Sequence, residues 1–173
     1  MRGLIGLLPF NVIVTGLFAS FGGSPKEYAL NAIHSIDIHH CPFEQTLSHK
    51  MKQAKKRILQ KEIHSDTFDY VNRNFTPEAL FEYLQTELPA QQKLVFTHGD
   101  LYMNNILISK NRLYGVVDWS RGGYCDYHYD ISIILHNIEK YMDSKYKTLF
   151  LEYYKYPIDE KMINYYWKLN EFF

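Results

Sequence analysis

The sequence predicts an α+β fold that is mainly helical and carries one small β-hairpin. Apolar residues recur at helical spacing near the end of the chain, where helices are expected over residues 127–140, 143–155 and 158–170. Two short apolar runs, residues 106–108 and 113–117, are separated by a polar turn at residues 110–112 and predict the hairpin. A length of 173 residues, 46% of them hydrophobic, is typical of one globular domain.

The N-terminal stretch from residue 3 to residue 21 contains no charged side chain. A helix of this length could cross about 30 Å of hydrocarbon, but Pro9, Asn11 and several glycines interrupt the run, and only Arg2 precedes it. Three interpretations stay open: a segment packed on the domain or marking a gene junction, a membrane segment, and a signal peptide. We therefore divide the chain into a hydrophobic segment, residues 1–23, and a domain, residues 24–173.

Three helices and a strand are expected before the hairpin. Ser24 can cap a helix with Pro25 in its first turn, so a helix is predicted to about His34. A further helix is expected over residues 77–88, ended by a proline, and residues 94–96 read as a short buried strand. Between them, apolar residues from Leu47 to Ile58 define an amphipathic helix whose other faces carry lysines.

The charge pattern gives no reason to expect a nucleic-acid partner or an anionic membrane. The chain has 19 basic and 19 acidic residues, so its formal net charge is zero. The lysines of the amphipathic helix lack interleaved aromatic residues and a recognised binding motif. We read them as a solvated surface.

The two cysteines, Cys41 and Cys125, lie far apart and do not form the dense framework of a small secreted domain, which predicts a cytoplasmic protein. Cys41 follows His34, His39 and His40, a set that zinc could use in principle. The adjacent histidines need not face one metal, and no second ligand cluster occurs, so zinc is not expected.

The chemistry is concentrated in the residues after the expected strand. Asp100 lies two residues after His98, and Asn105 lies five residues after Asp100. This spacing is that of a kinase catalytic loop, with Gly99 where protein kinases carry arginine. Such a loop can present the Asp100 carboxylate to a substrate hydroxyl while Asn105 faces a nucleotide-bound metal.

A second acidic position, Asp118, follows the hairpin, eighteen residues after Asp100. Kinases hold a magnesium-binding aspartate at this point, and magnesium prefers oxygen ligands such as the Asp118 carboxylate and the Asn105 carbonyl. Each motif alone is common and usually structural. Their combination predicts a phosphotransferase that uses ATP and Mg²⁺.

Residues 25–173 resemble the C-terminal lobe of the aminoglycoside 3'-phosphotransferases. The resemblance is carried by Ala32-Ile-His-Ser-Ile-Asp-Ile with Cys41-Pro-Phe, by residues 94–105, by Val117-Asp-Trp-Ser-Arg-Gly-Gly with Tyr129-Asp-Ile, and by residues 165–173. It implies a protein-kinase-like fold in which the helical lobe and its hairpin carry the catalytic and metal sites. The last segment resembles the family's terminus, so a complete C-terminus is expected.

The resemblance also implies the roles of individual residues. Asp100 would orient or deprotonate the attacking sugar hydroxyl, Asn105 and Asp118 would bind magnesium, and His98 would support the loop. Arg121 lies where the family has an arginine near the active centre, and an ordinary surface ion pair is the alternative for it.

An aminoglycoside carries several ammonium groups, so its pocket should contain converging carboxylates. Candidates for substrate binding, each of which could instead be a surface acid, are Asp66, Asp69, Glu171 and the carboxylate of Phe173. Many family members have two acids where Tyr70 and Val71 stand here, which leaves the substrate open.

Neither a glycine-rich phosphate loop nor a strand with a buried lysine precedes Pro25, so the resemblance implies that the N-terminal nucleotide-binding lobe is absent. Three hypotheses follow. The first is ATP-dependent phosphoryl transfer to an aminoglycoside by a truncated resistance enzyme, completed by a separately encoded lobe. The second is a non-catalytic remnant. The third is a related small-molecule kinase that acts on choline, homoserine or a macrolide.

Overall fold

The computed structural model describes residues 29–109 and 112–173. The hydrophobic segment 1–23, the expected helix start at Ser24 and Pro25, and the turn residues Lys110 and Asn111 lie outside the described residues. In the described part, no helix is long and apolar enough to cross a membrane.

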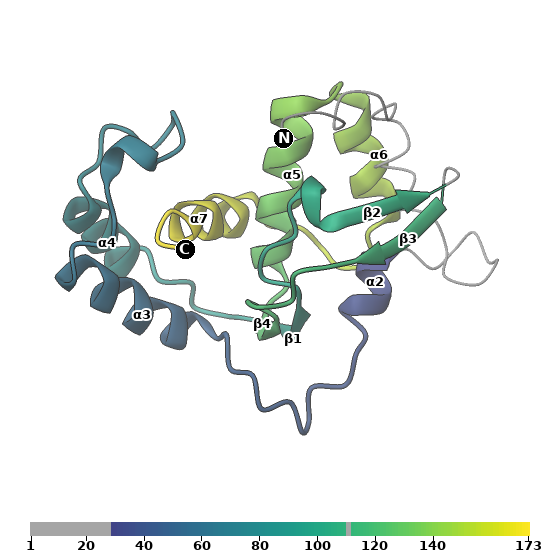
Figure 1. Ribbon diagram of the computed structural model, residues 1–173, viewed down its shortest axis with the longest axis horizontal. Coiled ribbons are helices and arrows are strands. Elements are labelled where there is room, and N and C mark those ends of the chain that lie inside the picture. Colours follow the sequence, from purple (N-terminus) through teal and green to yellow (C-terminus); the bar gives the residue numbers. More distant parts are fainter. Residues whose placement is uncertain (1–28, 110–111) are drawn as a thin grey trace.

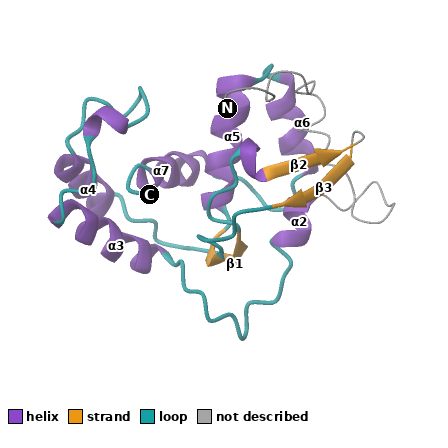
Figure 2. Cartoon of the chain, viewed as in Figure 1, coloured by secondary structure: helices purple, strands orange, loops and turns teal. Residues whose placement is uncertain are grey.

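The described chain is mainly helical with two small sheets, which confirms the α+β class (Figures 1 and 2). The helices are α2 (Ala29–Ile33), α3 (Leu47–Leu59), α4 (Pro77–Thr86), α5 (His128–Tyr141), α6 (Lys145–Tyr153) and α7 (Glu160–Asn170). The strands are β1 (Leu94–Thr97), β2 (Ile106–Ser109), β3 (Arg112–Val116) and β4 (Gly123–Asp126). The bounds of α5, α6 and α7 agree with the expected helices within two residues.

Helix α4 begins with a threonine cap and a proline, the two residue types that predict a helix start. The Thr76 hydroxyl accepts a hydrogen bond from the Ala79 amide at 3.2 Å, and Pro77 occupies the first turn, where no intrahelical N–H partner is needed. The helix ends two residues before the expected Leu88. The residue before a proline avoids the helical region, so Pro89 disfavours a helical Leu88.

The hairpin forms as expected, with β2 and β3 antiparallel and Ile106 opposite Val116. A second antiparallel pair, β1 with β4, was only half predicted, because β4 was not anticipated. Thr97 at the end of β1 lies opposite Gly123. This second pair matters for function because the loop that carries Asp100 leaves the end of β1.

Two hydrophobic clusters share the central helix α5, which lies between α7 and α6 in Figure 1. Tyr129 and Ile133 pack with α3, α4 and α7, whereas Ile131 and Ile134 pack with α6 and the hairpin. A helix that is apolar on most of its circumference is a buried core helix. Its first turn therefore lies deep in the molecule, directly beneath the loop after β1.

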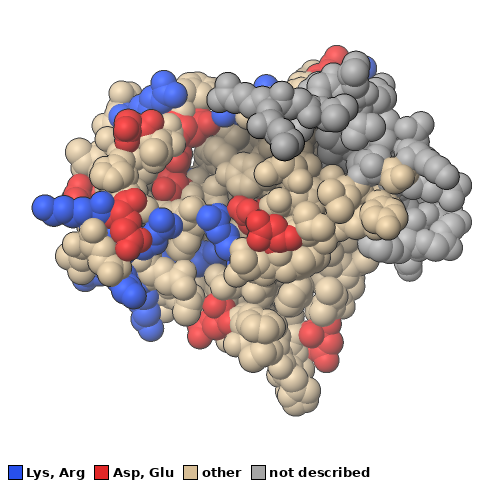
Figure 3. Space-filling model, in the orientation of Figure 1, with Lys and Arg blue, Asp and Glu red and all other residues tan. Residues whose placement is uncertain are grey.

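Charged side chains are interspersed over α3 and α4 on the face drawn in Figure 3. One lysine departs from the solvated role expected for the basic residues of α3. Lys50 is buried, and its Nζ lies 4.0 Å from the centre of the Tyr129 ring and 4.6 Å from that of Phe173. Aromatic faces can accept a cation, which accounts for a lysine on the inner side of this helix.

Candidate active site

The loop after β1 makes a sharp turn at Gly99, whose φ is +79°. A Cβ at this position would lie 2.2 Å from the main-chain oxygen of Arg121. Both the left-handed conformation and the close approach require glycine. The glycine that replaces the arginine of protein kinases thus lets the segment around Arg121 lie against the loop.

A buried carboxylate beneath the loop holds its main chain. Asp130, in the first turn of α5, accepts the His98 N–H at 2.8 Å and the Gly99 N–H at 2.8 Å. Burial alone raises the pKa of the Asp130 carboxyl, but hydrogen bonds from His34 and the two loop amides outweigh it and hold the pKa below its usual value. Sequence reasoning missed Asp130 as a site residue. A charged residue on the buried face of an apolar helix was the available signal.

His98 links the loop to the end of β3. Its Nδ1 accepts the Asp100 N–H at 3.2 Å, and its Nε2 lies 2.9 Å from the main-chain oxygen of Val117, to which it donates. These partners assign the neutral tautomer with the proton on Nε2. The buried ring also packs against Trp119, with centroids 4.4 Å apart.

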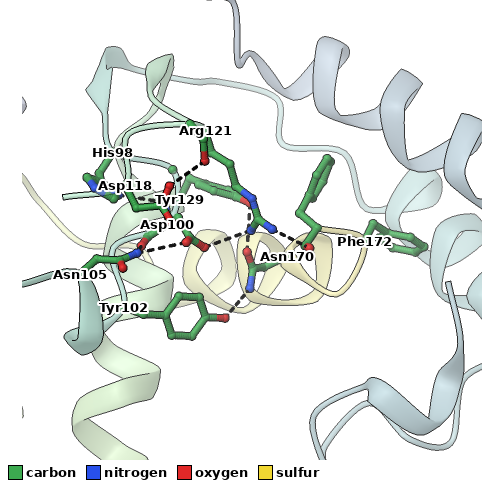
Figure 4. Close-up of polar contacts among 12 residues, drawn as sticks. His98, Asp100, Tyr102, Asn105, Asp118, Arg121, Tyr129, Asn170 and Phe172 are labelled. Carbon is green, nitrogen blue, oxygen red and sulfur yellow. Dashed lines mark hydrogen bonds and ion pairs between the residues drawn. The ribbon is translucent and has the colours of Figure 1, made fainter. Parts of the chain in front are cut away.

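Asp100 is held on both carboxylate oxygens (Figure 4). The Asn105 side-chain nitrogen donates to Oδ2 at 3.1 Å and to the Asp100 main-chain oxygen at 2.8 Å. Arg121 donates from Nη1 to Oδ1 at 3.0 Å. The structure therefore places the Asn105 and Arg121 side chains in contact with Asp100.

Arg121 also reaches the last residue of the chain. Its Nη2 donates to the main-chain oxygen of Phe173 at 2.7 Å, so one guanidinium spans Asp100 and Phe173. The Arg121 and Asp100 side chains are 35% and 22% exposed. Ion pairs this accessible contribute at most about 1 kcal/mol, so the contact orients these groups more than it stabilises the fold.

Asp118 follows β3 in a left-handed conformation with φ 64°. Aspartate tolerates this region better than most residues, and such strain is concentrated at functional sites. Ser120 Oγ donates to Asp118 Oδ1 at 3.0 Å. The preceding residue, Val117, donates its N–H to the main-chain oxygen of Asn105 at 2.9 Å, so Asp118 and Asn105 come from adjacent segments.

These two residues fit a magnesium ion by their chemistry. Asn105 uses its side-chain nitrogen on Asp100, which leaves its carbonyl oxygen as a ligand atom. Asp118 is exposed and supplies a carboxylate. Oxygen ligands from one or two side chains, completed by phosphate oxygens and water, are what magnesium prefers.

A cavity of about 670 Å³ opens beside Asp100. All four residues expected to bind substrate line it, together with Asp100 and Arg121; the four are Asp66, Asp69, Glu171 and Phe173. Tyr70, which stands where many family members have an acid, also lines the cavity and is 70% exposed. Glu62 lies in the loop after α3, as Asp66 and Asp69 do. It pairs with Arg57 at 3.1 Å and is not among the residues that line the cavity.

Within the cavity, Asp69 already has basic partners. Its Oδ2 lies 3.1 Å from His136 Nε2 and 3.7 Å from Lys140 Nζ. The His136 ring stacks on Trp167 at 3.6 Å. Burial lowers the pKa of His136 although Asp69 acts in the opposite direction, so the imidazole is neutral and donates a hydrogen bond at pH 7.

Glu171 ties the loop after α3 to the end of α7. Its Oε1 accepts the Asp69 N–H at 3.0 Å and the Asn72 side-chain nitrogen at 2.7 Å. Burial raises the pKa of the Glu171 carboxyl. Glu171 is therefore a structural link as well as an acid facing the cavity.

A carboxylate that lines a cavity, beside oxygen ligands suited to magnesium, is an arrangement typical of a phosphotransferase. The chain belongs to the phosphotransferase enzyme family, whose sequence model matches residues 28–160. An aminoglycoside 3'-phosphotransferase of Niallia circulans is 36% identical over 152 residues, which are 86% of this chain and 58% of the relative. An aminoglycoside 3'-phosphotransferase of Enterococcus faecalis is 31% identical over 152 residues, which are 83% of this chain and 55% of the relative. The chain thus spans little more than half the length of these relatives.

Solved structures share the fold. The crystal structure of an aminoglycoside-3'-phosphotransferase of type VIII matches with a TM-score of 0.80 at 23% identity, over 94% of this chain and 60% of that one. An aminoglycoside phosphotransferase of Streptomyces rimosus, in complex with ADP and streptomycin, matches with a TM-score of 0.73 at 20% identity, over 94% and 61%. The kinase-like fold expected from the sequence is confirmed.

Proposed function

We propose that this chain catalyses transfer of the γ-phosphoryl group of ATP to a hydroxyl of an aminoglycoside, a reaction that confers antibiotic resistance. The observation that carries the proposal is the placement of Asp100 at a cavity lined by acids, in contact with Asn105 and Arg121. The names of the relatives support it, because they are aminoglycoside 3'-phosphotransferases. The domain that does this is residues 24–173.

In the proposed reaction, Asp100 accepts a hydrogen bond from the substrate hydroxyl and takes its proton as the new oxygen–phosphorus bond forms and the bond to ADP breaks. Asn105 fixes Asp100 Oδ2, so Oδ1 is the oxygen that meets the hydroxyl once Arg121 releases it. Arg121 then remains anchored by Phe173, near the developing negative charge. His98 supports the loop during these steps.

Asn105 and Asp118 are the proposed magnesium ligands. Magnesium, when bound, neutralises charge on the β- and γ-phosphates of ATP. The two residues lie on adjacent segments, the loop after β1 and the end of β3, so a magnesium ion held by both would lie close to Asp100. The proposal places the protein in the cytoplasm, where ATP is available. A separately encoded lobe with a glycine-rich loop and a lysine is the proposed partner.

The acids of the cavity are the proposed ligands of the substrate's ammonium groups. Asp66 is exposed, and it lines the same cavity as Glu171 and Phe173. Asp69 accepts a hydrogen bond from His136 and lies 3.7 Å from the Lys140 ammonium group, so it contributes less to a bound cation.

The test is transfer of labelled phosphate from ATP to kanamycin by the chain at high concentration. We expect slow transfer that is abolished in Asp100→Ala and retained in Asp143→Ala, a matched change of an exposed acid outside the cavity. Transfer to choline, homoserine or a macrolide in preference to kanamycin would overturn the substrate. Binding of kanamycin without any transfer would instead identify a non-catalytic remnant.

A further inference from the structure

A buried histidine outside the cavity reaches the carboxylate that holds the catalytic loop. His34 follows α2, and its Nε2 lies 3.1 Å from Asp130 Oδ2, with both side chains wholly buried. Asp130 in turn accepts the amides of His98 and Gly99, the two residues that precede Asp100. A continuous chain of hydrogen bonds therefore runs from α2 to the main chain that presents Asp100.

A tyrosine lies on the other side of the ring, with its hydroxyl 2.7 Å from His34 Nδ1. The Asp130 carboxylate can only accept a hydrogen bond, so His34 Nε2 must donate to it. In the tautomer with the proton on Nε2, Nδ1 accepts from the Tyr154 hydroxyl, whose pKa is raised by burial. The imidazole proton then lies on Nε2 and points at Asp130. Tyr154 and His34 thus form a directed relay that supplies one donor to the carboxylate.

Loss of that donor would be felt in the loop. Asp130 is completely buried, and burial favours its neutral form. Without His34, protonation becomes easier, and a protonated carboxyl turns one acceptor oxygen into a donor that cannot accept the His98 or Gly99 amide. The carboxylate would then hold the turn at Gly99 less firmly.

We propose that His34 is a positioning residue for phosphoryl transfer, acting through Asp130 on the loop that presents Asp100. This inference rests on the proposed function of Asp100, but the contacts that carry it are independent of turnover. It is separate from the cavity, because neither His34 nor Tyr154 is among the cavity-lining residues.

The same protein contains a matched pair that does not touch the loop. His128 Nδ1 lies 2.7 Å from Asp126 Oδ1, and both side chains are nearly as buried as His34 and Asp130. The other bonds of this pair reach the amides of Lys93 and Asp159. Truncating His128 therefore removes a buried histidine–aspartate contact of the same kind while leaving the loop bonds in place.

The experiment measures amide hydrogen exchange by NMR in His34→Ala, His34→Gln and His128→Ala. We expect His34→Ala to speed exchange at His98 and Gly99 by roughly tenfold relative to the core amide of Ile133, the change that follows from one lost hydrogen bond. His34→Gln should restore much of the protection, because its side-chain nitrogen can donate to Asp130. His128→Ala should speed exchange at Asp159 and leave the loop unchanged.

An activity arm separates positioning from general structure. Where transfer is measurable, we expect His34→Ala to lower kcat by about tenfold with KM for kanamycin unchanged, because the cavity is intact. Unchanged exchange at His98 and Gly99 in His34→Ala would overturn the inference, as would an equal change in His128→Ala. Since exchange needs no turnover, absence of transfer in the unaltered chain would count against the proposed function alone.

Discussion

Lys50 is a buried cation with aromatic neighbours and no ion-pair partner among the described residues. Burial lowers its pKa from 10.5 to about 8, with opposing contributions from nearby groups such as Cys125, Asp130 and Asp100. A shift of this size corresponds to a cost of about 3 kcal/mol for the charged form. Contact with the two rings recovers part of that cost. Lys50 thus contacts the Phe173 ring while its buried charge lowers the free energy of unfolding.

We therefore expect Lys50→Met to be more stable than the unaltered protein at pH 7, by about 1–2 kcal/mol, because an apolar side chain of similar size removes the buried charge. The cost is complete below pH 8. Between pH 8 and 10.5 the folded protein has lost the lysine proton while the unfolded chain retains it, so the advantage of the variant shrinks as pH rises. Urea denaturation at pH 7 and 9.5 measures this difference.

The control for this prediction is Lys52→Met, which changes an exposed lysine of the same helix and should leave stability unchanged at both pH values. A Lys50→Met variant less stable than the unaltered protein at pH 7 would show that the ring contacts outweigh desolvation.

The turn at Gly99 has no room for a side chain. Gly99→Ala places a Cβ against the Arg121 main chain at a positive φ, so we expect a loss of about 1–3 kcal/mol in unfolding free energy. Gly115→Ala adds a Cβ where no heavy atom lies within 4 Å, and it should change stability by less than about 0.5 kcal/mol. Denaturant melts of both variants test this. Equal losses would mean that the turn at Gly99 is not constrained.

The site residues that could be predicted from sequence were those that lie close together along the chain. His98, Asp100 and Asn105 lie on one loop, so their spacing alone indicated a shared site. The burial of the Asp130 and Lys50 side chains was not predicted, because elements distant in sequence form their surroundings. Burial of a charge is a tertiary property, and helical periodicity shows only that a face is apolar.

At the scale of elements, the loop after α3 depends on α7 through Glu171. We expect Glu171→Gln to preserve this link, because the amide oxygen can accept both hydrogen bonds, and to weaken kanamycin binding on the order of tenfold through loss of one charge-assisted contact. Its raised pKa means that Glu171 favours folding most at low pH and that this contribution is lost as pH rises through the folded-state pKa. Stability at pH 7 should therefore not fall in Glu171→Gln.

Calorimetric titration with kanamycin and urea denaturation test these two expectations together. Glu82→Gln, an exposed acid on α4, is the control and should change neither quantity. If Glu171→Gln bound kanamycin as tightly as the unaltered chain, Glu171 would be only a structural link.

Helices and the hairpin were predictable from sequence because caps and periodicity lie within each element. Strand β4 was not, since its four residues show no alternation and begin with Gly123. It forms by pairing with β1, and the glycine at its start leaves room for the Phe43 main chain, whose oxygen would lie 2.3 Å from a Cβ. That pairing, in turn, sets the position from which the catalytic loop departs.

At the scale of the whole molecule, α5 connects the two halves of the candidate site. Its first turn holds the loop that carries Asp100 through Asp130, and later turns supply His136 and Lys140 to the cavity. The helix is fixed by both hydrophobic clusters. Because one helix contacts the loop that carries Asp100 and also lines the cavity, it ties the positions of the two together, which favours a preorganised site.

The molecule spans 58% of its Niallia circulans relative, and its described residues include the proposed base and metal ligands but no glycine-rich phosphate loop. Phosphoryl transfer depends on holding the phosphates as much as on the base. We therefore expect a fusion of the relative's preceding segment to residues 28–173 to bind Mg-ATP and to transfer phosphate to kanamycin on the order of a thousandfold faster than the chain alone. Calorimetry and the labelled-phosphate assay measure the two effects separately.

Asp100→Ala in the fusion is the control that separates nucleotide binding from chemistry. It should bind Mg-ATP as tightly as the unaltered fusion and show no transfer above background, because the missing carboxylate contacts the hydroxyl and not the nucleotide. A fusion that binds both ligands yet transfers no faster than the chain alone would contradict the proposed roles of Asp100, Asn105 and Asp118. It would place the defect in these residues, because the phosphates would then be held and the substrate cavity filled.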